Sequence, residues 1–222
     1  MLLSRVRVAL PITVMLILWG CSTAPEFVAR HEPWRVDEER ACLSSGIVRE
    51  NNHIRGRSTL GGPSVCGTAR PFEMSAAARG RVSMKPAALL RCPMIPQIER
   101  WVETVVGPAA RMYLGGQLVE MKVAASYACR PINHQSGARL SEHGHANALD
   151  ISAFYLADGR VVTVKAGWHG DAGERAFLRA AHRGACDGFT TVLGPDADRF
   201  HHDHFHVDLA RHGRDGLMRI CK

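Results

Sequence analysis

Four of the chain's twelve histidines lie within six residues, His201–His206, in the stretch RFHHDHFHVDL. Histidine is the commonest metal ligand among side chains, so a bound metal is the first hypothesis for this stretch. Successive side chains of a β-strand point to opposite faces, which would place His204, His206 and Asp208 on one face. Because the other face belongs to an apolar core, the polar face should point to a cleft or to solvent; the apolar residues are Phe205, Val207 and Leu209.

A second part of the chain can complete such a site. A catalytic zinc ion usually takes three protein ligands and keeps one position open for water. In RLSEHGHANALDI, His143 and Asp150 are seven residues apart, which on a continuous helix is about 10 Å and too far for one ion. The intervening Gly144, Ala146 and Asn147 instead permit a turn. We therefore expect His143 to precede the turn and Asp150 to enter the following strand.

Each of these residues also has an ordinary interpretation. A lone H-x-H pair is more often a surface or loop pair, and a histidine-rich tract can simply collect metal ions. His143 and Asp150 alone indicate little, because both residue types are common in turns. Asp208 could equally make a structural hydrogen bond or orient His206. Taken together, the two motifs favour a metal site. We expect His145 and His202 to be exposed neighbours of the motif residues. The remaining histidines have no motif context: His31, His53, His134, His169, His182 and His212.

The flanking sequence predicts two helices. From Gln97, apolar residues recur at helical spacing until Gly107-Pro108, which should end that helix. A second helix is expected over about Ala172–Arg183, because Asp171 can cap its start and Gly184 can close it.

Strand patterns occupy the remainder of this region. Val119, Met121 and Val123 alternate with other residues, and Asp158-Gly159 separates two strand-like runs, as in a hairpin. The segments FTTVLGP and HFHVDLA supply two further strands. The sequence therefore predicts an α+β domain in which helices flank a small, mainly antiparallel sheet.

The first residues resemble an export signal. Arg5 and Arg7 precede an apolar run, Val8–Trp19, that is too short and ends too abruptly for a membrane span. Leu18–Cys21 resembles a bacterial lipobox, so Cys21 is the expected lipidation site and membrane anchor; simple secretion or an uncleaved anchor stays open. We expect an exported, periplasmic protein, attached to the bacterial envelope as a lipoprotein.

Six cysteines follow Cys21 and agree with export: Cys42, Cys66, Cys92, Cys129, Cys186 and Cys221. In an oxidising compartment an even set indicates disulfides, and the 15 possible connectivities stay open. A structural zinc site would need closely spaced pairs such as C-x-x-C, and the sequence has none.

The chain divides into three parts by pattern. Residues 1–20 form the expected signal. Residues 21–84 show no sustained periodicity, and we expect a tether followed by a loop-rich segment held by disulfides at Cys42 and Cys66. Residues 85–222 carry the helix and strand patterns of the folded domain.

Charge limits the class of partner. The formal net charge is +7, and removal of residues 1–20 takes away two arginines and no acids. The remaining modest basic excess suits an anionic cell-wall polymer or lipid headgroups. Nucleic acid is not an expected partner, because the chain has no concentrated basic patch with aromatic platforms.

Several motifs together resemble a known family. SEHGHANALD is similar to the S-x-H-x(6)-D motif, and HFH to the H-x-H motif, of zinc D-alanyl-D-alanine carboxypeptidases and related peptidoglycan endopeptidases. The run from LLRCP through YACR, GARLSEH, NALDISAF, LADGR, TVLGP and DHFHVDLA more closely resembles the bacterial extensin-like C-terminal domain family, over about Leu89–Cys221. The resemblance implies a zinc D-Ala-D-Ala peptidase-like fold and a zinc-dependent peptidase or amidase acting on peptidoglycan peptides.

The resemblance also implies a ligand set. His143, Asp150 and His206 match the zinc ligands, and His204 matches a group that borders the metal. One position departs from the relatives, which usually have glycine where this chain has Ala146. If that position requires a positive φ, the turn is strained.

Other matched positions concern substrate and proton transfer. Asp203, three residues before the last ligand, matches the general base of several relatives, although Asp is shorter than their usual Glu. His201 matches a histidine of other relatives, so either residue could take the proton. Arg130 matches an arginine near the substrate carboxylate or the oxyanion, and Ser141 matches the motif serine. Arg130 could equally be a structural ion-pair partner.

Three functions from different classes stay open. The first is a zinc hydrolase of peptidoglycan peptides, with an open metal position and a nearby base. The second is a metal-containing cell-wall-binding module without turnover, which a closed site with His201 as fourth ligand would favour. The third is an outer-membrane structural lipoprotein, for which the anchor and basic surface matter more than the cleft.

Overall fold

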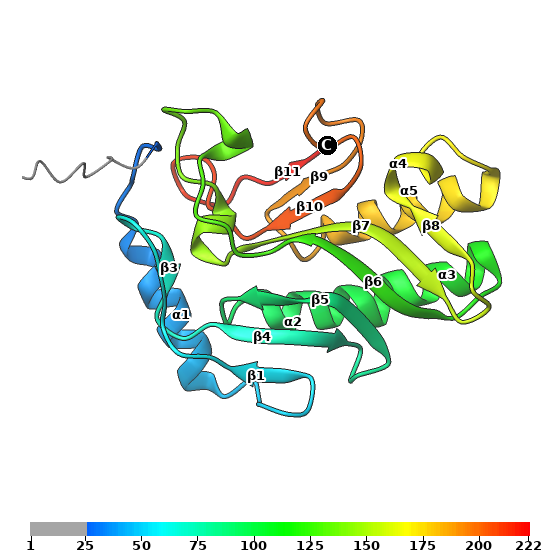
Figure 1. Ribbon diagram of the computed structural model, residues 1–222, viewed down its shortest axis with the longest axis horizontal. Helices are drawn as coiled ribbons and strands as arrows, with labels where there is room; N and C mark the ends of the chain where they lie inside the picture. The colour runs from blue at the N-terminus through cyan, green and yellow to red at the C-terminus, as the bar shows by residue number, and fades with distance from the viewer. Residues whose placement is uncertain (1–25) are drawn as a thin grey trace, which may run out of the picture.

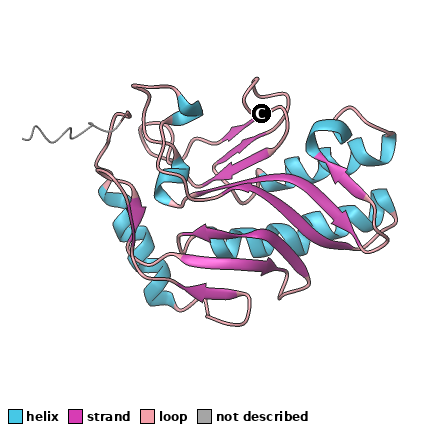
Figure 2. Cartoon of the chain, in the orientation of Figure 1, coloured by secondary structure: helices cyan, strands magenta, loops and turns pink. Residues whose placement is uncertain are grey.

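The computed structural model describes residues 26–222 (Figure 1). The expected export signal and Cys21 lie outside the described residues. Within residues 26–222, no helix combines the length and apolar character needed to cross a membrane. The predicted α+β class is confirmed, because helices flank a main mixed sheet (Figure 2).

The main sheet of the described chain has nine strands in the order β1-β4-β5-β6-β7-β10-β9-β11, with β8 paired to β7. Neighbouring strands are antiparallel except for the pairs β5–β6 and β9–β11. A separate two-stranded sheet pairs β2 (Leu60–Gly61) with β3 (Gly67–Thr68). The strands of the main sheet are β1 Ile54–Gly56, β4 Phe72–Ala77, β5 Val82–Leu90, β6 Leu118–Ala125, β7 Ala148–Leu156, β8 Val161–Thr163, β9 Thr191–Leu193, β10 Phe205–Asp208 and β11 Ile220–Cys221.

A long helical connection joins the parallel strands β5 and β6, as parallel pairing requires. It consists of α2 (Met94–Trp101), the π-helical turn η1 (Val102–Val106) and α3 (Gly107–Leu114). The expected stop at Gly107-Pro108 is wrong. Gly107 N–H bonds the carbonyl of Val102, five residues back, and Pro108 occupies the first turn of α3, where its missing N–H is tolerated.

The second predicted helix is confirmed as α5 (Ala172–Ala185), with the short α4 (Val164–Gly167) before it. The Asp171 carboxylate accepts a hydrogen bond of 2.9 Å from Glu174 N–H and caps α5. Gly184 does not close this helix but lies in its last turn. The predicted hairpin is also confirmed, since β7 and β8 are antiparallel neighbours.

The segment expected to be loop-rich contains regular elements. Pro33–Ser45 form α1, and β1 and β4 extend the main sheet beyond β5, which itself spans residue 84. The expectation of irregular structure is wrong for these stretches. Helix α1 has few apolar residues and therefore shows no helical hydrophobic period. It is held instead by Arg35, which forms two hydrogen bonds of 2.7 and 2.5 Å to the Glu142 carboxylate.

The disulfide prediction is confirmed for all six cysteines. The pairs are Cys42–Cys92, Cys66–Cys129 and Cys186–Cys221. The first attaches α1 to the end of β5, and the last attaches the chain's C-terminal strand to α5. Each bridge closes a loop of 35 to 63 residues in sequence separation, and long closed loops restrict the unfolded chain.

Gly184 provides a test of helix packing. A Cβ at Gly184 would overlap the side chain of Val105 in η1. We predict that Gly184→Ala lowers the free energy of unfolding by about 1–3 kcal/mol, although alanine favours helices by about 1 kcal/mol. Urea unfolding measures this change.

The control is the same substitution in a Val105→Ala background. There the overlap is relieved, and Gly184→Ala should cost nothing or should stabilise. A cost that is equal in both backgrounds would show that helix packing is not the cause.

Candidate metal centre

Two histidines and one aspartate converge in the structure. His143 Nε2 lies 3.1 Å from Asp150 Oδ2, and His206 Nδ1 lies 2.9 Å from Asp150 Oδ1. The two imidazole nitrogens are 3.2 Å apart. All three side chains are buried. The structure thus brings together the three residues that were predicted from the sequence as ligands, and one ligand atom from each lies within 4.8 Å of the other two.

The sheet register positions two of the three. Strands β7 and β10 are antiparallel, and His206 is the direct partner of Asp150. Directly opposed residues share a face of the sheet. The alternate residues Phe205 and Val207 are fully buried on the other face, as the sequence pattern predicted.

The tight turn before β7 positions His143. The turn η3 (Glu142–His145) begins at Ser141, whose hydroxyl accepts the N–H of His143 at 3.4 Å. It ends at Ala146, which has φ = +52°. The suspected positive φ is present, and a non-glycine residue there costs about 1–2 kcal/mol. This reversal lets His143 precede the turn while Asp150 enters β7.

Hydrogen bonds on the far side of each ring hold its orientation. His143 Nδ1 donates to the carbonyl oxygen of Ser126 at 2.5 Å, which leaves the Nε2 lone pair facing Asp150. His206 Nε2 donates to Asp208 Oδ2 at 2.9 Å, which directs Nδ1 toward Asp150 and the cluster. Outer partners of this kind orient metal-bound imidazoles. Asp208 therefore orients His206, which is one of the two roles the sequence left open.

Asp208 is itself held by further groups that the sequence did not indicate. Thr191 is its direct partner across β9 and β10. Burial would raise the pKa of Asp208, but His206 and then a hydrogen bond from Thr191 lower it. The same hydroxyl lies 2.7 Å from His212 Nε2. A chain of hydrogen bonds thus runs from His212 to His206. Only the three-dimensional pairing of β9 with β10 reveals it.

The cluster is electrostatically built for a cation. Burial alone would raise the pKa of Asp150, but His143 and His206 outweigh burial and hold that pKa well below its usual range. Burial would lower the pKa of His206, whereas hydrogen bonds and charges from Asp150 and Asp208 raise it to about 10. A positive charge is therefore favoured between these carboxylates. Two imidazole nitrogens and one carboxylate oxygen also match the donor set of catalytic zinc sites.

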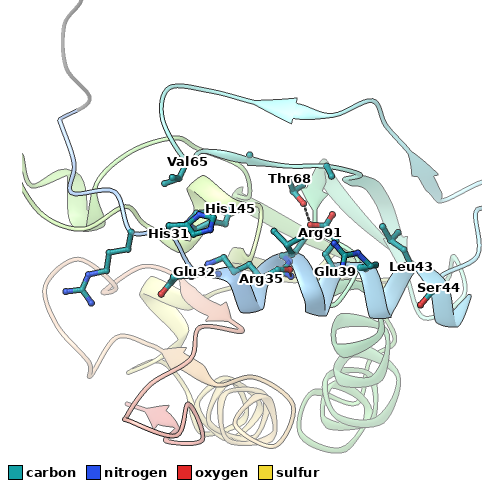
Figure 3. Close-up of a pocket in the computed structure, with 15 residues that line it drawn as sticks. His31, Glu32, Arg35, Glu39, Leu43, Ser44, Val65, Thr68, Arg91 and His145 are labelled. Atoms are coloured by element: carbon teal, nitrogen blue, oxygen red, sulfur yellow. Dashed lines mark hydrogen bonds and ion pairs between the residues drawn. The ribbon is translucent and has the colours of Figure 1, made fainter.

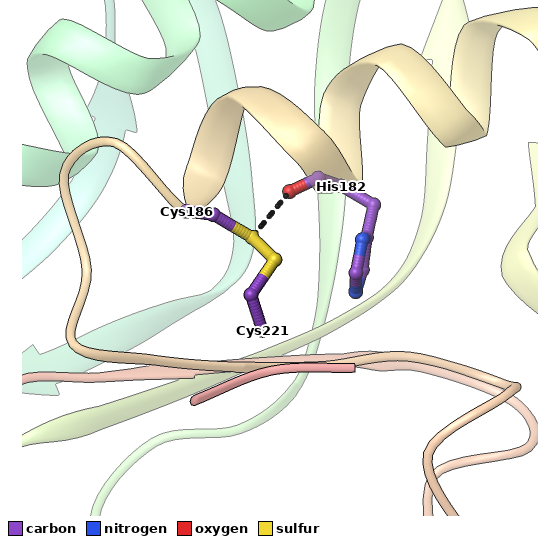
Figure 4. Close-up of side chains that lie close together, drawn as sticks. All are labelled: His182, Cys186 and Cys221. Atoms are coloured by element: carbon purple, nitrogen blue, oxygen red, sulfur yellow. Dashed lines mark hydrogen bonds between the residues drawn. A yellow bond between two sulfur atoms is a disulfide. The ribbon is translucent and has the colours of Figure 1, made fainter. Parts of the chain in front are cut away.

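A second grouping of metal-ligand residue types does not fit a metal. His182 lies beside Cys186 and Cys221, but the two sulfurs are bonded to each other (Figure 4). A disulfide has no thiolate to offer, and thiolate is the form that binds zinc. The ring of His182 instead bonds the carbonyl of Lys222 at 2.9 Å.

The candidate general bases differ in their position. The cluster opens into a cleft of about 430 Å³, and His201 and His204 line it. Asp203 is not among the described residues that line this cleft. Its side chain is 47% exposed and accepts a hydrogen bond of 2.9 Å from His204 Nδ1. Asp203 therefore orients His204, whose Nε2 lies 3.7 Å from Asp150 Oδ2.

His201 has the geometry of a base. Its Nδ1 donates to Asp198 Oδ1 at 2.8 Å, which leaves the Nε2 lone pair free to accept a proton. Its ring centre lies 5.7 Å from that of His206. Burial lowers the pKa of His201 and outweighs the opposing Asp198, which keeps the ring neutral near pH 7. Asp198 was not predicted from the sequence as a site residue. Its position three residues before His201 was the available signal for this contact.

Arg130 and Ser141 also line the cleft, with different roles. Arg130 is half-buried, and within the described chain it forms no ion pair; burial lowers its pKa, and Asp150 partly opposes this. Its guanidinium is thus available to an anionic group. The Ser141 hydroxyl oxygen accepts the N–H of His143 and so helps to fix that residue.

The geometry defines a mixed α+β protein whose sheet carries a His/Asp/His cluster at the base of a cleft. The family model for the extensin-like protein C-terminus matches residues 40–222. The chain therefore belongs to the extensin-like C-terminal family, and the match begins well before Leu89, within α1. Comparison with curated proteins and with solved structures found no match.

The hydrogen-bond chain behind His206 yields a prediction. Thr191→Val removes the hydroxyl that holds Asp208 and should lower zinc affinity by up to about tenfold, the smaller end of the effect of groups that orient metal ligands. Competition with a chromophoric chelator measures the affinity. Thr191→Ser should restore it.

The matched control is Thr190→Val on the adjacent position. Thr190 Oγ1 bonds only the backbone carbonyl of Asp208, at 3.3 Å. If both valine variants lose zinc affinity equally, the hydrogen bond from Thr191 to Asp208 is not what positions His206.

Proposed function

We propose that this protein is a zinc-dependent hydrolase of peptidoglycan peptides in the bacterial envelope. The observation that carries the proposal is the convergence of His143, Asp150 and His206 at the base of an open cleft. The S-x-H-x(6)-D and H-x-H motifs, shared with zinc D-Ala-D-Ala peptidases, support the same reaction class. We also propose that the fold is related to that of those peptidases.

A zinc ion held by two neutral imidazoles and a carboxylate would polarise a peptide carbonyl and lower the pKa of a bound water to about 7. The chain's own residues supply the remaining steps. His201 Nε2 accepts the proton of the attacking water, while Asp198 holds the ring and stabilises its cationic form. Arg130 stabilises the developing oxyanion or binds a substrate carboxylate.

His204 and Asp203 form a second pair beside the cluster. The hydrogen bond from His204 Nδ1 to Asp203 directs Nε2 toward Asp150 and the cleft. We assign this pair to positioning of the substrate or the transition state. His201, with its partner Asp198, is the preferred base, and Asp203 is the alternative.

An envelope location is part of the proposal. The N-terminal residues resemble a lipoprotein signal with Cys21 as the lipidated residue. Three disulfides in the described chain agree with an oxidising compartment. The basic net charge suits an anionic wall polymer.

The first experiment measures metal content and activity together. The purified protein is assayed for zinc, and peptidoglycan digested with and without a chelator is examined by mass spectrometry. We expect about one zinc per chain and release of cleaved peptides that the chelator abolishes. Zinc without cleavage would favour the metal-containing cell-wall-binding module. Absence of zinc would contradict both the hydrolase and the binding-module hypotheses.

Removal of one ligand tests the metal site. His206→Ala takes away a donor and leaves the buried Asp150 without its closest partner, so zinc content and turnover should both be lost. Because this variant could also lose stability, thermal unfolding is measured with and without zinc. Zinc should raise the melting temperature of the wild type and leave that of the variant unchanged.

Substitution of the proposed base separates catalysis from metal binding. His201→Gln should lower kcat by about 10²–10⁴-fold with zinc content unchanged. The adjacent His202→Gln is the matched control, since that side chain is exposed and does not line the cleft. It bonds the carbonyl of Arg199 and lies 3.8 Å from Asp203 Oδ2. Loss of turnover in Asp203→Asn, with full activity in His201→Gln, would move the base role to Asp203.

A further inference from the structure

A second cavity lies on the other side of the turn that carries His143. Its volume is about 650 Å³, within the range of small-molecule sites. Helix α1, the loop around β3 and the turn η3 enclose it (Figure 3). It shares no lining residue with the metal cleft. An inference about this cavity therefore stands apart from the proposed hydrolase activity.

The acidic side chains of the cavity already have partners. Glu32 accepts a hydrogen bond of 2.7 Å from Arg35 Nε. Glu39 accepts hydrogen bonds from the Thr68 hydroxyl and from the backbone N–H of Arg70. Glu32 is therefore paired with a cation, and both oxygens of Glu39 accept hydrogen bonds from the protein itself.

The basic side chains of the cavity are not fully used. The side chain of Arg91 is only 1% exposed, and Nη2 donates to the carbonyl of Arg35 at 2.6 Å. Nη2 also lies 3.3 Å from Glu38 Oε2, without hydrogen-bond geometry. Arg91 Nε and Nη1 have no partner within residues 26–222. Buried guanidinium N–H groups normally have acceptors, so this arginine lacks one.

Two histidines, His31 and His145, line the cavity among residues of predominantly positive charge. His145 lies on η3 and lines the cavity with Arg35 and Arg91. His145 is half-buried, so the expectation that it is an exposed neighbour is wrong. Arginines outnumber carboxylates in the lining, which contains Arg30, Arg35, Arg40 and Arg91 against Glu32 and Glu39. The lining therefore carries more formal positive than negative charge.

The remaining wall is apolar. Val36, Leu43, Val65 and Ala69 line the cavity beside the cationic groups. Val36 is 54% exposed. An apolar wall next to a cation with unused donors matches a molecule that has an acidic group and a short apolar part.

We propose that this cavity binds a small amphipathic anion, with its acidic group at the Arg91 and His145 end and its apolar part against Val36, Leu43 and Val65. The acidic group is a carboxylate or a phosphate, because both accept hydrogen bonds from guanidinium. Arg91 lines the cavity, so the acidic group would face its positive charge.

Ligand titration of the full purified protein tests the proposal. The probes are hexanoate and hexyl phosphate, with hexylamine and hexanol as controls of equal chain length. Binding is followed at pH 7 by the NMR signals of the His145 ring, assigned with His145→Gln. We expect both anions, but neither control, to shift these signals saturably. The tighter of the two anions then identifies the acidic group.

A charge variant at the exposed Val36 tests the proposal without changing the buried Arg91. Val36→Glu places a like charge beside the ligand and should weaken anion binding by about tenfold or more. Ile47→Glu, at another exposed apolar residue near α1 but outside the cavity, should leave it unchanged. Equal binding of hexanol, absence of any His145 shift, or equal affinity in both variants would overturn the proposal.

Discussion

The buried carboxylate of Asp150 is the constraint around which the site is organised. An ionised carboxylate in this position is costly unless cationic or hydrogen-bonding partners surround it. His143 and His206 supply those partners at 3.1 and 2.9 Å. Asp208 and the carbonyl of Ser126 then hold the two rings from behind. The result is a preformed arrangement of donor atoms that needs little reorganisation to accept a cation.

Three features of the fold bring these distant sequence positions together. The antiparallel register of β7 and β10 sets Asp150 opposite His206. The turn through Ala146 returns the chain so that His143 reaches the same point. Helix α1 braces that turn, because Arg35 bonds Glu142, the residue directly before His143. The positive φ of Ala146 is thus retained within a surrounding network that over-determines the turn.

Much of the site was predictable from sequence because its signals are local. The alternation of FHVDL fixed which side chains of β10 face the cleft, and Gly144 and Asn147 indicated the turn. Partners from other elements left no such signal: Asp198 lies in a loop, Thr191 acts across a strand pair, and Arg35 belongs to a helix without apolar periodicity. The continuation of the helix through Gly107-Pro108 was missed for a similar reason, because a single π-helical turn accommodates proline without a pattern that sequence reveals.

The zinc K-edge X-ray absorption spectrum of the zinc-loaded protein tests the central claim most directly. We predict a four-coordinate ion with two imidazole nitrogens at about 2.0–2.1 Å, one carboxylate oxygen and one oxygen from water. The imidazole contribution should fall in His143→Gln and stay unchanged in His202→Gln. A third imidazole in place of water would mean a closed site, and a spectrum indifferent to His143 would place the metal elsewhere and contradict the assignment.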